Sequence, residues 1–301
     1  MSGICDGRVV IVTGAGRGIG RAHALAFAAE GAAVVVNDVG VALDGSGGAA
    51  GPAQQVVDEI VAAGGRAVPN TDDVADWTGA ENMVQTAVSQ FGRLDVLVNN
   101  AGFVRDRMLA NLGEDEWDAV VRVHLKGHFA PLRHAAAYWR AESKAGRQPD
   151  ARVVNTSSGA GLMGSVGQAN YSAAKAGITA LSLVAAAELG RYGVTVNAIA
   201  PSARTRMTEE VFADMMAAPD GGFDAMAPEN ISPLVVWLGS ADSAAVSGRV
   251  FEVEGGKVTV ADGWQHGPSM DKGARWQPAE LGPALADLLA KAPAPTPVYG
   301  A

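Results

Sequence analysis

The chain has 301 residues, of which 48% are hydrophobic, so it is long enough to bury one large core. Its formal net charge of −9 argues against a nucleic-acid or anionic-membrane partner, because either would require a concentrated basic surface. The single cysteine, Cys5, excludes an intrachain disulfide. Because we find no leader and no apolar span of membrane length, we expect a reduced, cytoplasmic protein. The histidines show no metal-ligand pattern, so we expect no metal site.

The first predicted element is a short buried strand over residues 8–13, followed by a glycine-rich turn and an alanine-rich helix. Strand, glycine turn and helix in this order are the context that a dinucleotide motif requires. Glycines let the backbone approach a pyrophosphate, whose charge is held by the N–H groups at the start of the helix. The candidate phosphate-binding residues of the turn are Gly14, Arg17, Gly18, Ile19 and Gly20.

A second buried strand, residues 32–37, ends in Asp38, about 20 residues beyond the glycines, where a carboxylate would hold a ribose 2′-hydroxyl. Asp38 therefore favours NAD. Arg17 is the opposing signal, since a cation there could meet the 2′-phosphate of NADP. A carboxylate at Asp38 would repel that phosphate, so we expect NAD as the cofactor.

Further strands are predicted at residues 66–70, 94–98, 152–157 and 194–200, with helices between them. This alternation predicts an α/β protein with a Rossmann-like, doubly wound parallel sheet flanked by helices. Residues 41–50, between Gly40 and Pro52, are predicted as a loop, and residues 205–222 as a short helix and flexible segment over the site. We expect one domain, residues 1–262, and a C-terminal extension, residues 263–301, with a helix near 278–291 and a frayed tail from 292.

Tyr171 and Lys175 lie four residues apart, a spacing that places a phenol and an ammonium on one helix face. A cation held close to a phenol favours the phenolate and suits it to proton transfer. The same spacing also occurs by chance on solvated helices. The pair therefore gains meaning only together with the glycine turn.

The chain resembles the short-chain dehydrogenase/reductase family over about residues 7 to 260, on motifs that occur in that family's order. These motifs are Thr13-Gly14, Gly18-Ile19-Gly20, Asp73-Val74, Asn99-Asn100-Ala101-Gly102, Ser158 and Tyr171 with Lys175. The resemblance implies hydride transfer between a nicotinamide and a carbinol carbon, with Tyr171 exchanging the hydroxyl proton. Lys175 would lower the pKa of Tyr171 and bind the nicotinamide ribose, and Ser158 would position the substrate oxygen.

The resemblance also implies cofactor contacts from residues after the strands. Asp73, with Val74 beside it, would hold the adenine amino group, and Asn99 with Ala101 and Gly102 would bind the adenosine ribose. From the residues alone, these side chains could equally cap helices or form turns, and Ser157 is a rival to Ser158.

Within the family, residues 36–40, 104–107, 122–127 and 168–175 look like the (3R)-hydroxyacyl-CoA dehydrogenase unit of multifunctional enzyme type 2. Two positions depart from the general family pattern. His124 stands where an asparagine usually holds a water of the proton relay, and it could serve that water or simply pack in the core. Pro201 is not followed by glycine, and Thr205 is the candidate for the nicotinamide amide.

The resemblance implies an NAD-dependent 3-hydroxyacyl-CoA dehydrogenase, acting on a fatty acyl or steroid side chain, that assembles as a homodimer or homotetramer. Its alternatives are an NADPH-dependent 3-oxoacyl-(acyl-carrier-protein) reductase and a non-catalytic nucleotide-binding protein. An acyl-CoA carries phosphates that an acidic protein must meet with local cations. The candidates for this contact are Arg105, Arg107, Arg204, Arg206 and Lys257.

Overall fold

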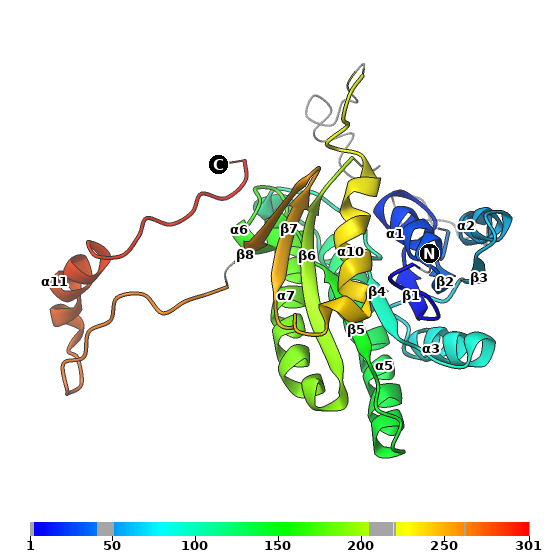
Figure 1. Ribbon diagram of the computed structural model, residues 1–301. Coiled ribbons are helices and arrows are strands. Elements are labelled where there is room, and N and C mark those ends of the chain that lie inside the picture. Colours follow the sequence, from blue (N-terminus) through cyan, green and yellow to red (C-terminus); the bar gives the residue numbers. More distant parts are fainter. Residues whose placement is uncertain (1–2, 41–50, 205–218, 220, 262, 301) are drawn as a thin grey trace.

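A computed structural model describes residues 3–40, 51–204, 219, 221–261 and 263–300. Within these residues, eight strands form one sheet in the order β3-β2-β1-β4-β5-β6-β7-β8 (Figure 1). All neighbouring strands run parallel except β8, which runs antiparallel to β7. The strands are β1 Val9–Thr13, β2 Ala33–Asn37, β3 Arg66–Asn70, β4 Val96–Asn99, β5 Ala151–Thr156, β6 Val194–Ser202, β7 Val250–Glu254 and β8 Lys257–Ala261.

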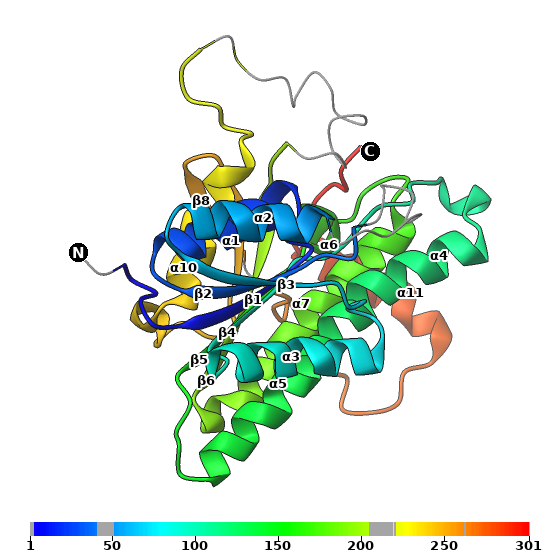
Figure 2. The same cartoon turned by 90° about the vertical axis from the view of Figure 1, so that its right-hand side faces the viewer.

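Helices cover both faces of the sheet, as Figure 2 shows for the two layers on either side of β1 and β2. One layer contains α1 (Gly18–Ala29), α2 (Gly51–Ala62) and α10 (Ser232–Gly239). The other contains α3 (Trp77–Phe91), α5 (Gly127–Lys144) and α7 (Ala169–Leu189). The remaining helical elements are η1 Leu109–Asn111, α4 Glu114–Val121, the π-helical turn η2 Arg122–Lys126, α6 Gly159–Met163, η3 Gly190–Tyr192, η4 Pro228–Ile231, η5 Ala241–Ser243 and α11 Pro278–Leu289.

The side chains of β1 explain why both faces are covered. Val10 and Val12 pack in the cluster under α1, α2 and α10, whereas Val9 and Ile11 pack in the cluster under α3, α5 and α7. Alternate residues of a strand point to opposite faces, so a strand that is apolar at every position needs helices on both sides. This arrangement is the predicted Rossmann-like, doubly wound sheet.

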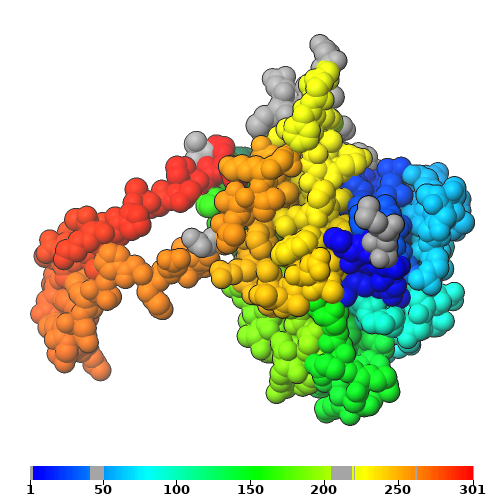
Figure 3. Space-filling view, viewed as in Figure 1, coloured from blue at the N-terminus to red at the C-terminus, as the bar shows by residue number. Residues whose placement is uncertain are grey.

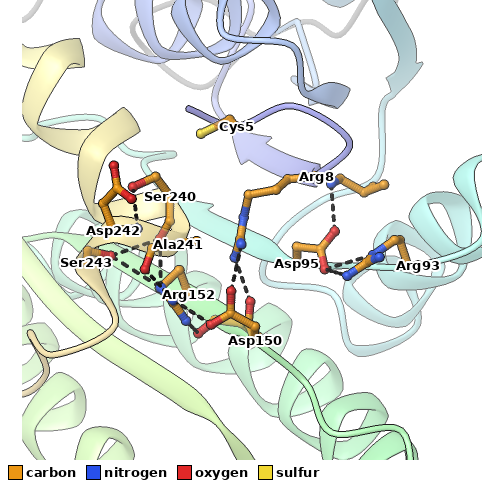
Figure 4. Close-up of polar contacts among 12 residues, drawn as sticks. Cys5, Arg8, Arg93, Asp95, Asp150, Arg152, Ser240, Ala241, Asp242 and Ser243 are labelled. Atoms are coloured by element: carbon orange, nitrogen blue, oxygen red, sulfur yellow. Dashed lines mark hydrogen bonds and ion pairs between the residues drawn. The ribbon is translucent and has the colours of Figure 1, made fainter. Parts of the chain in front are cut away.

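A cluster of ion pairs lies at the amino ends of the central strands, opposite to the ends that carry the predicted site (Figure 4). Asp150 accepts from Arg8 at 3.0 Å and pairs with Arg152 at 2.5 Å. The Arg152 side chain is almost fully buried, and its Nε donates to the carbonyl oxygen of Ser240 at 2.9 Å. Burial alone would raise the pKa of Asp150, but the hydrogen bonds from Arg8 and Arg152 hold it below its usual value. The cluster therefore fastens β1, β5 and the segment after α10 to one another.

The C-terminal extension forms an arm that stands away from the rest of the molecule and then returns to it (Figures 1 and 3). Its helix α11 begins at Pro278 as predicted and has no buried residue. The boundary predicted between residues 262 and 263 falls next to a residue outside the described ones and stays a prediction.

Several predicted elements differ from the observed ones. The predicted strand over 94–98 is observed over Val96–Asn99, and β7, β8 and α10 were not predicted. The loop predicted over residues 41–50 lies outside the described residues and stays a prediction, and α2 begins directly after it at Gly51.

One helical segment, Ala169–Tyr192, is long and apolar enough to cross a membrane by length and composition, whereas no such span was expected. A core helix of a soluble protein passes the same test, and this segment contains the predicted Tyr171 and Lys175. Length and composition therefore do not assign it to a membrane.

Candidate active site

The glycine turn joins β1 to α1 and is packed too closely to accept side chains. Gly14 has a φ of +63°, which suits glycine, and the N–H of the next residue, Ala15, donates to the carbonyl oxygen of Asn37 at 2.8 Å. A Cβ on Gly20 would overlap the carbonyl oxygen of Gly14 and lie 2.5 Å from Nδ2 of Asn100. The helix start is thus drawn against the end of β1, which leaves its N–H groups to face a phosphate.

The turn before α1 and the carboxyl end of β2 meet at Asp38. Its Oδ2 accepts from the N–H of Gly16 at 2.8 Å, and its Oδ1 accepts from the N–H of Gly40 at 2.7 Å. Arg17 is exposed at the start of α1, and its side chain makes no capping hydrogen bond. The glycine turn and the Asp38 carboxylate therefore fit the pyrophosphate and ribose of a dinucleotide.

Tyr171 and Lys175 lie on α7, and the Lys175 Nζ is 5.4 Å from the centroid of the Tyr171 ring. The same Nζ donates to the carbonyl oxygen of Thr156 at 2.7 Å. Burial lowers the pKa of Lys175 to about 7. Burial raises the pKa of Tyr171, while a hydrogen bond with Ser158 lowers it. The hydrogen bond from Ser158 therefore contributes to stabilising the phenolate of Tyr171, a role that the sequence analysis gave to Lys175.

The two serines at the end of β5 have different surroundings. Ser157 is 1% exposed, and its hydroxyl donates to the carbonyl oxygen of Lys175 at 2.9 Å, so it fastens the strand to α7. Ser158 caps α6, accepting from the N–H of Ala160 at 3.2 Å, and is the serine that bonds Tyr171. The geometry favours Ser158 over Ser157 as the group beside the reacting oxygen.

His124 lies in the π-helical turn η2, 1% exposed, with its ring edge-on to Tyr171 at 5.1 Å between centroids. Its Nε2 is 2.6 Å from the carbonyl oxygen of Phe103, and its Nδ1 is buried without a partner among the described residues. Burial, with a smaller effect of Lys175, lowers the pKa of His124 well below its usual range. Burial therefore favours the neutral form of the ring, and the relay role of His124 stays a prediction. Gly102 makes room for the ring, because a Cβ there would lie 2.7 Å from Nδ1.

Asn99 does not present its side chain to the site. Its amide is fully buried and donates to Oδ1 of Asn155 at 2.9 Å, so a ribose contact from this residue would have to come from its backbone. Asn100, which belongs to the motif but was given no role of its own, donates from its backbone to Thr13 Oγ1 at 2.9 Å and from Nδ2 to the Thr13 carbonyl oxygen at 3.0 Å. The Asn-Asn pair in the sequence was the available signal, because two adjacent strand-end residues must face different sides.

Asp73 has local partners. Its Oδ1 accepts from the N–H of Ala75 at 2.8 Å, and its Oδ2 pairs with Arg122 at 2.6 Å. Val74 is buried against Gly127, where a Cβ would lie 2.6 Å from its Cγ2. The adenine contact stays a prediction for both residues.

The other predicted positions are distributed around the carboxyl ends of the strands. Ala101 donates to Thr13 Oγ1 at 3.1 Å, Ile19 packs partly buried on the core, and Pro201 lies on β6. Thr205 and Arg206 lie outside the described residues. Two of the predicted cation contacts are occupied within the chain, Arg107 by Glu116 at 3.2 Å and Arg204 by Asp224.

The end of the extension returns to the turn that contains α6. The N–H of Val166 donates to the carbonyl oxygen of Tyr299 at 2.9 Å, and the N–H of Tyr299 donates to Gly164 at 3.2 Å. The Tyr299 ring covers Gly159, where a Cβ would lie 3.0 Å from Cε2. The prediction of a frayed tail is therefore wrong for Tyr299, which borders the site next to Ser158. Among the described residues, no three His, Cys, Asp or Glu side chains form a metal-binding cluster.

Known proteins resemble this chain in sequence and in fold. A family model of the short chain dehydrogenases matches residues 8–216. The chain is 49% identical over 299 residues to hydroxyacyl-CoA dehydrogenase ChsB1 of Mycobacterium tuberculosis, covering 95% of this chain and 89% of that protein. It is 45% identical over 253 residues to the peroxisomal multifunctional enzyme type 2 of Mus musculus, covering 84% of this chain and 32% of that enzyme.

Among solved structures, the crystal structure of a short chain dehydrogenase from Mycobacterium avium is 70% identical, with a TM-score of 0.90. The match covers 99% of this chain and 100% of that one. The chain therefore belongs to the short-chain dehydrogenase/reductase family and is an oxidoreductase that binds a nicotinamide cofactor.

Proposed function

We propose that the protein is an NAD-dependent dehydrogenase that oxidises the secondary alcohol of a 3-hydroxyacyl-CoA. The observation that carries this proposal is that Ser158, Tyr171 and Lys175 meet at the same edge of the sheet as the glycine turn and Asp38, whose carboxylate accepts from the N–H of Gly16. The name of the Mycobacterium tuberculosis relative supports the substrate class. Membership of an oxidoreductase family removes the non-catalytic alternative.

The residues have separate tasks in this reaction. A bound nicotinamide supplies the hydride acceptor. Tyr171 takes the proton from the substrate hydroxyl as a general base, and Ser158 holds the substrate oxygen by a hydrogen bond. Lys175 stabilises the phenolate in its charged form. Because burial sets the pKa of Lys175 at about 7, its charge and the reaction rate both change near neutral pH.

Asp38 supports NAD over NADP. Its two carboxylate oxygens accept from the N–H groups of Gly16 and Gly40, which hold the carboxylate beside the glycine turn, where a ribose would bind. The negatively charged 2′-phosphate of NADP would lie close to the Asp38 carboxylate, and the repulsion between the two charges disfavours NADP binding. The same argument disfavours the NADPH-dependent 3-oxoacyl-(acyl-carrier-protein) reductase.

We also propose a cytoplasmic homodimer or homotetramer. The support for self-association is the outer face of α7, where Leu183 and Val184 are 44% and 56% exposed, next to a groove between α5 and α7. Exposed apolar surface of this kind favours burial against another protein surface.

The test is a set of initial rates with NAD and NADP, using (3R)- and (3S)-3-hydroxyacyl-CoAs and hydroxysteroids of several sizes. Turnover of a 3-hydroxyacyl-CoA with NAD at least tenfold faster than with NADP is the expected result. Faster turnover with NADP would contradict the argument from Asp38. Turnover of steroids alone would overturn the substrate class.

A further inference from the structure

The end of the extension pairs with the loop between α6 and α7. Tyr299 and Ser165 form a parallel β-bridge. In this bridge the N–H of Val166 donates to the carbonyl oxygen of Tyr299 at 2.9 Å, and the N–H of Tyr299 donates to the carbonyl oxygen of Gly164 at 3.2 Å. Both hydrogen bonds come from the backbone of Tyr299, so they fix where its side chain begins but do not depend on the ring.

Two glycines of α6 let other segments approach this short helix closely from two sides. A Cβ on Gly159 would lie 3.0 Å from Cε2 and 3.1 Å from the hydroxyl oxygen of Tyr299. A Cβ on Gly161 would lie 2.6 Å from the Cβ of Lys175. The helix therefore lies between the Tyr299 ring and the part of α7 that carries Lys175. Because Ser158 caps α6, the ring packs on the residue next to the proposed substrate-binding hydroxyl.

The surface around the Tyr299 ring is apolar and only partly covered. Val166, Val298 and Tyr299 are 45%, 41% and 50% exposed, respectively. Neither residues 159–168 nor residues 292–301 contain a charged side chain. The phosphates of a coenzyme A require cationic partners, which these two segments do not supply. Exposed apolar side chains next to the reacting groups suit the apolar part of a ligand instead.

We propose that Tyr299 is a specificity-determining residue whose ring contacts the apolar substituent on the carbinol carbon of the substrate. For a 3-hydroxyacyl-CoA this substituent is the acyl chain, so the inference rests on the proposed function. Consecutive Cα atoms are about 3.8 Å apart, so a chain of several carbons that starts beside Ser158 reaches the ring that packs on Gly159. A 3-hydroxybutanoyl group has a single carbon beyond its carbinol carbon and does not reach it. Tyr299 therefore favours long chains over short ones.

The substitution Tyr299→Ala removes the ring and keeps the two backbone hydrogen bonds that hold the loop. We expect kcat/KM for 3-hydroxydodecanoyl-CoA to fall roughly 10-fold, a factor that one or two methylene groups in an apolar contact produce. The value for 3-hydroxybutanoyl-CoA is expected to stay within about twofold, since this substrate does not touch the ring. NADH affinity, measured in parallel, shows whether the variant is folded.

Two variants serve as controls. Tyr299→Phe keeps the ring and loses only the hydroxyl, so the preference for the long chain remains. Leu289→Ala removes a 68% exposed apolar side chain from α11, which belongs to the same extension but stands away from α6 (Figure 1), and it leaves the preference unchanged. An equal fall for both chain lengths in Tyr299→Ala would show a purely structural role. That result, an unchanged long-to-short ratio, or an equal change in Leu289→Ala would overturn the proposal.

A second substrate series separates this inference from the proposed substrate class. If the unaltered protein oxidises no 3-hydroxyacyl-CoA, that class is refuted, and the same ratio is measured with 2-alkanols from 2-butanol to 2-decanol. These alcohols carry the apolar chain on the carbinol carbon without coenzyme A. A long-chain preference that Tyr299→Ala loses would sustain the role of Tyr299. A preference that persists in Tyr299→Ala, or no oxidation of any 2-alkanol by the unaltered protein, would overturn it.

Discussion

Replacing Gly20 by alanine tests whether the glycine turn holds a pyrophosphate. The added Cβ would overlap the carbonyl oxygen of Gly14 and lie 2.5 Å from Nδ2 of Asn100. Since real contacts of this kind rarely fall below about 3.4 Å, the start of α1 must move outward by roughly 1 Å. The end of β1 cannot yield instead, because its backbone is bonded to the end of β2 through Ala15.

A displacement of this size lengthens the hydrogen bonds from the helix start to a bound phosphate beyond their useful range. One hydrogen bond to a charged group contributes about 1.5–3 kcal/mol, so we expect NADH to bind roughly 10- to 150-fold more weakly. Isothermal titration calorimetry with NADH measures this directly. Gly190→Ala is the matched control, because a Cβ at that helical glycine meets nothing within 4 Å. Binding by folded Gly20→Ala within twofold of the unaltered protein would refute the phosphate cradle.

Three other outcomes follow from the charges in the fold. Asp38→Ala should lower the ratio of kcat/KM for NAD over NADP by roughly 10- to 100-fold, and an unchanged ratio would count against the ribose contact. Burial lowers the pKa of Lys175 from 10.5 to about 7. Between these two pH values, the unfolded chain therefore binds more protons at this residue than the folded chain does. The buried charge destabilises the fold most below about pH 7, where Lys175 is protonated in both states. Lys175→Met should therefore raise Tm more at about pH 6 than at about pH 10, and an equal rise at both would contradict this. Asp150 has a lowered pKa in the fold, so its stabilisation is present above its ordinary value of 3.8 and is lost as the pH falls through the folded pKa. Asp150→Asn should cost about 1 kcal/mol or less in urea unfolding at neutral pH and nothing in acid, whereas a deficit that persists in acid would show that charge is not its cause.

The parallel sheet was predictable because strands such as β1 and β2 are short, buried and rich in valine, and because the strands alternate with helices. The last two strands were missed, although their signal is local: residues 250–254 and 257–261 flank Gly255-Gly256, and a glycine pair between two β-rich runs is typical of a hairpin. The antiparallel end of the sheet follows from that hairpin.

The sequence predicts which residues form the candidate site better than it predicts the contacts that they make. The i, i+4 spacing places Tyr171 and Lys175 together, since helix geometry alone decides it. The spacing does not reveal that Asn99 points into the core while Asn100 binds the end of β1, because this depends on which face of the sheet each side chain meets. The contact of Tyr299 with the α6 turn joins residues far apart in the chain, and no local pattern encodes it.

The most direct test of the account compares the unaltered protein with Tyr171→Phe in the formation of NADH from NAD and a (3R)-3-hydroxyacyl-CoA, with NADH affinity measured in both. The account predicts turnover by the unaltered protein and a loss of roughly 10²- to 10⁴-fold in Tyr171→Phe, with NADH affinity retained. Turnover by Tyr171→Phe within tenfold of the unaltered protein would contradict the role of Tyr171 as the general base.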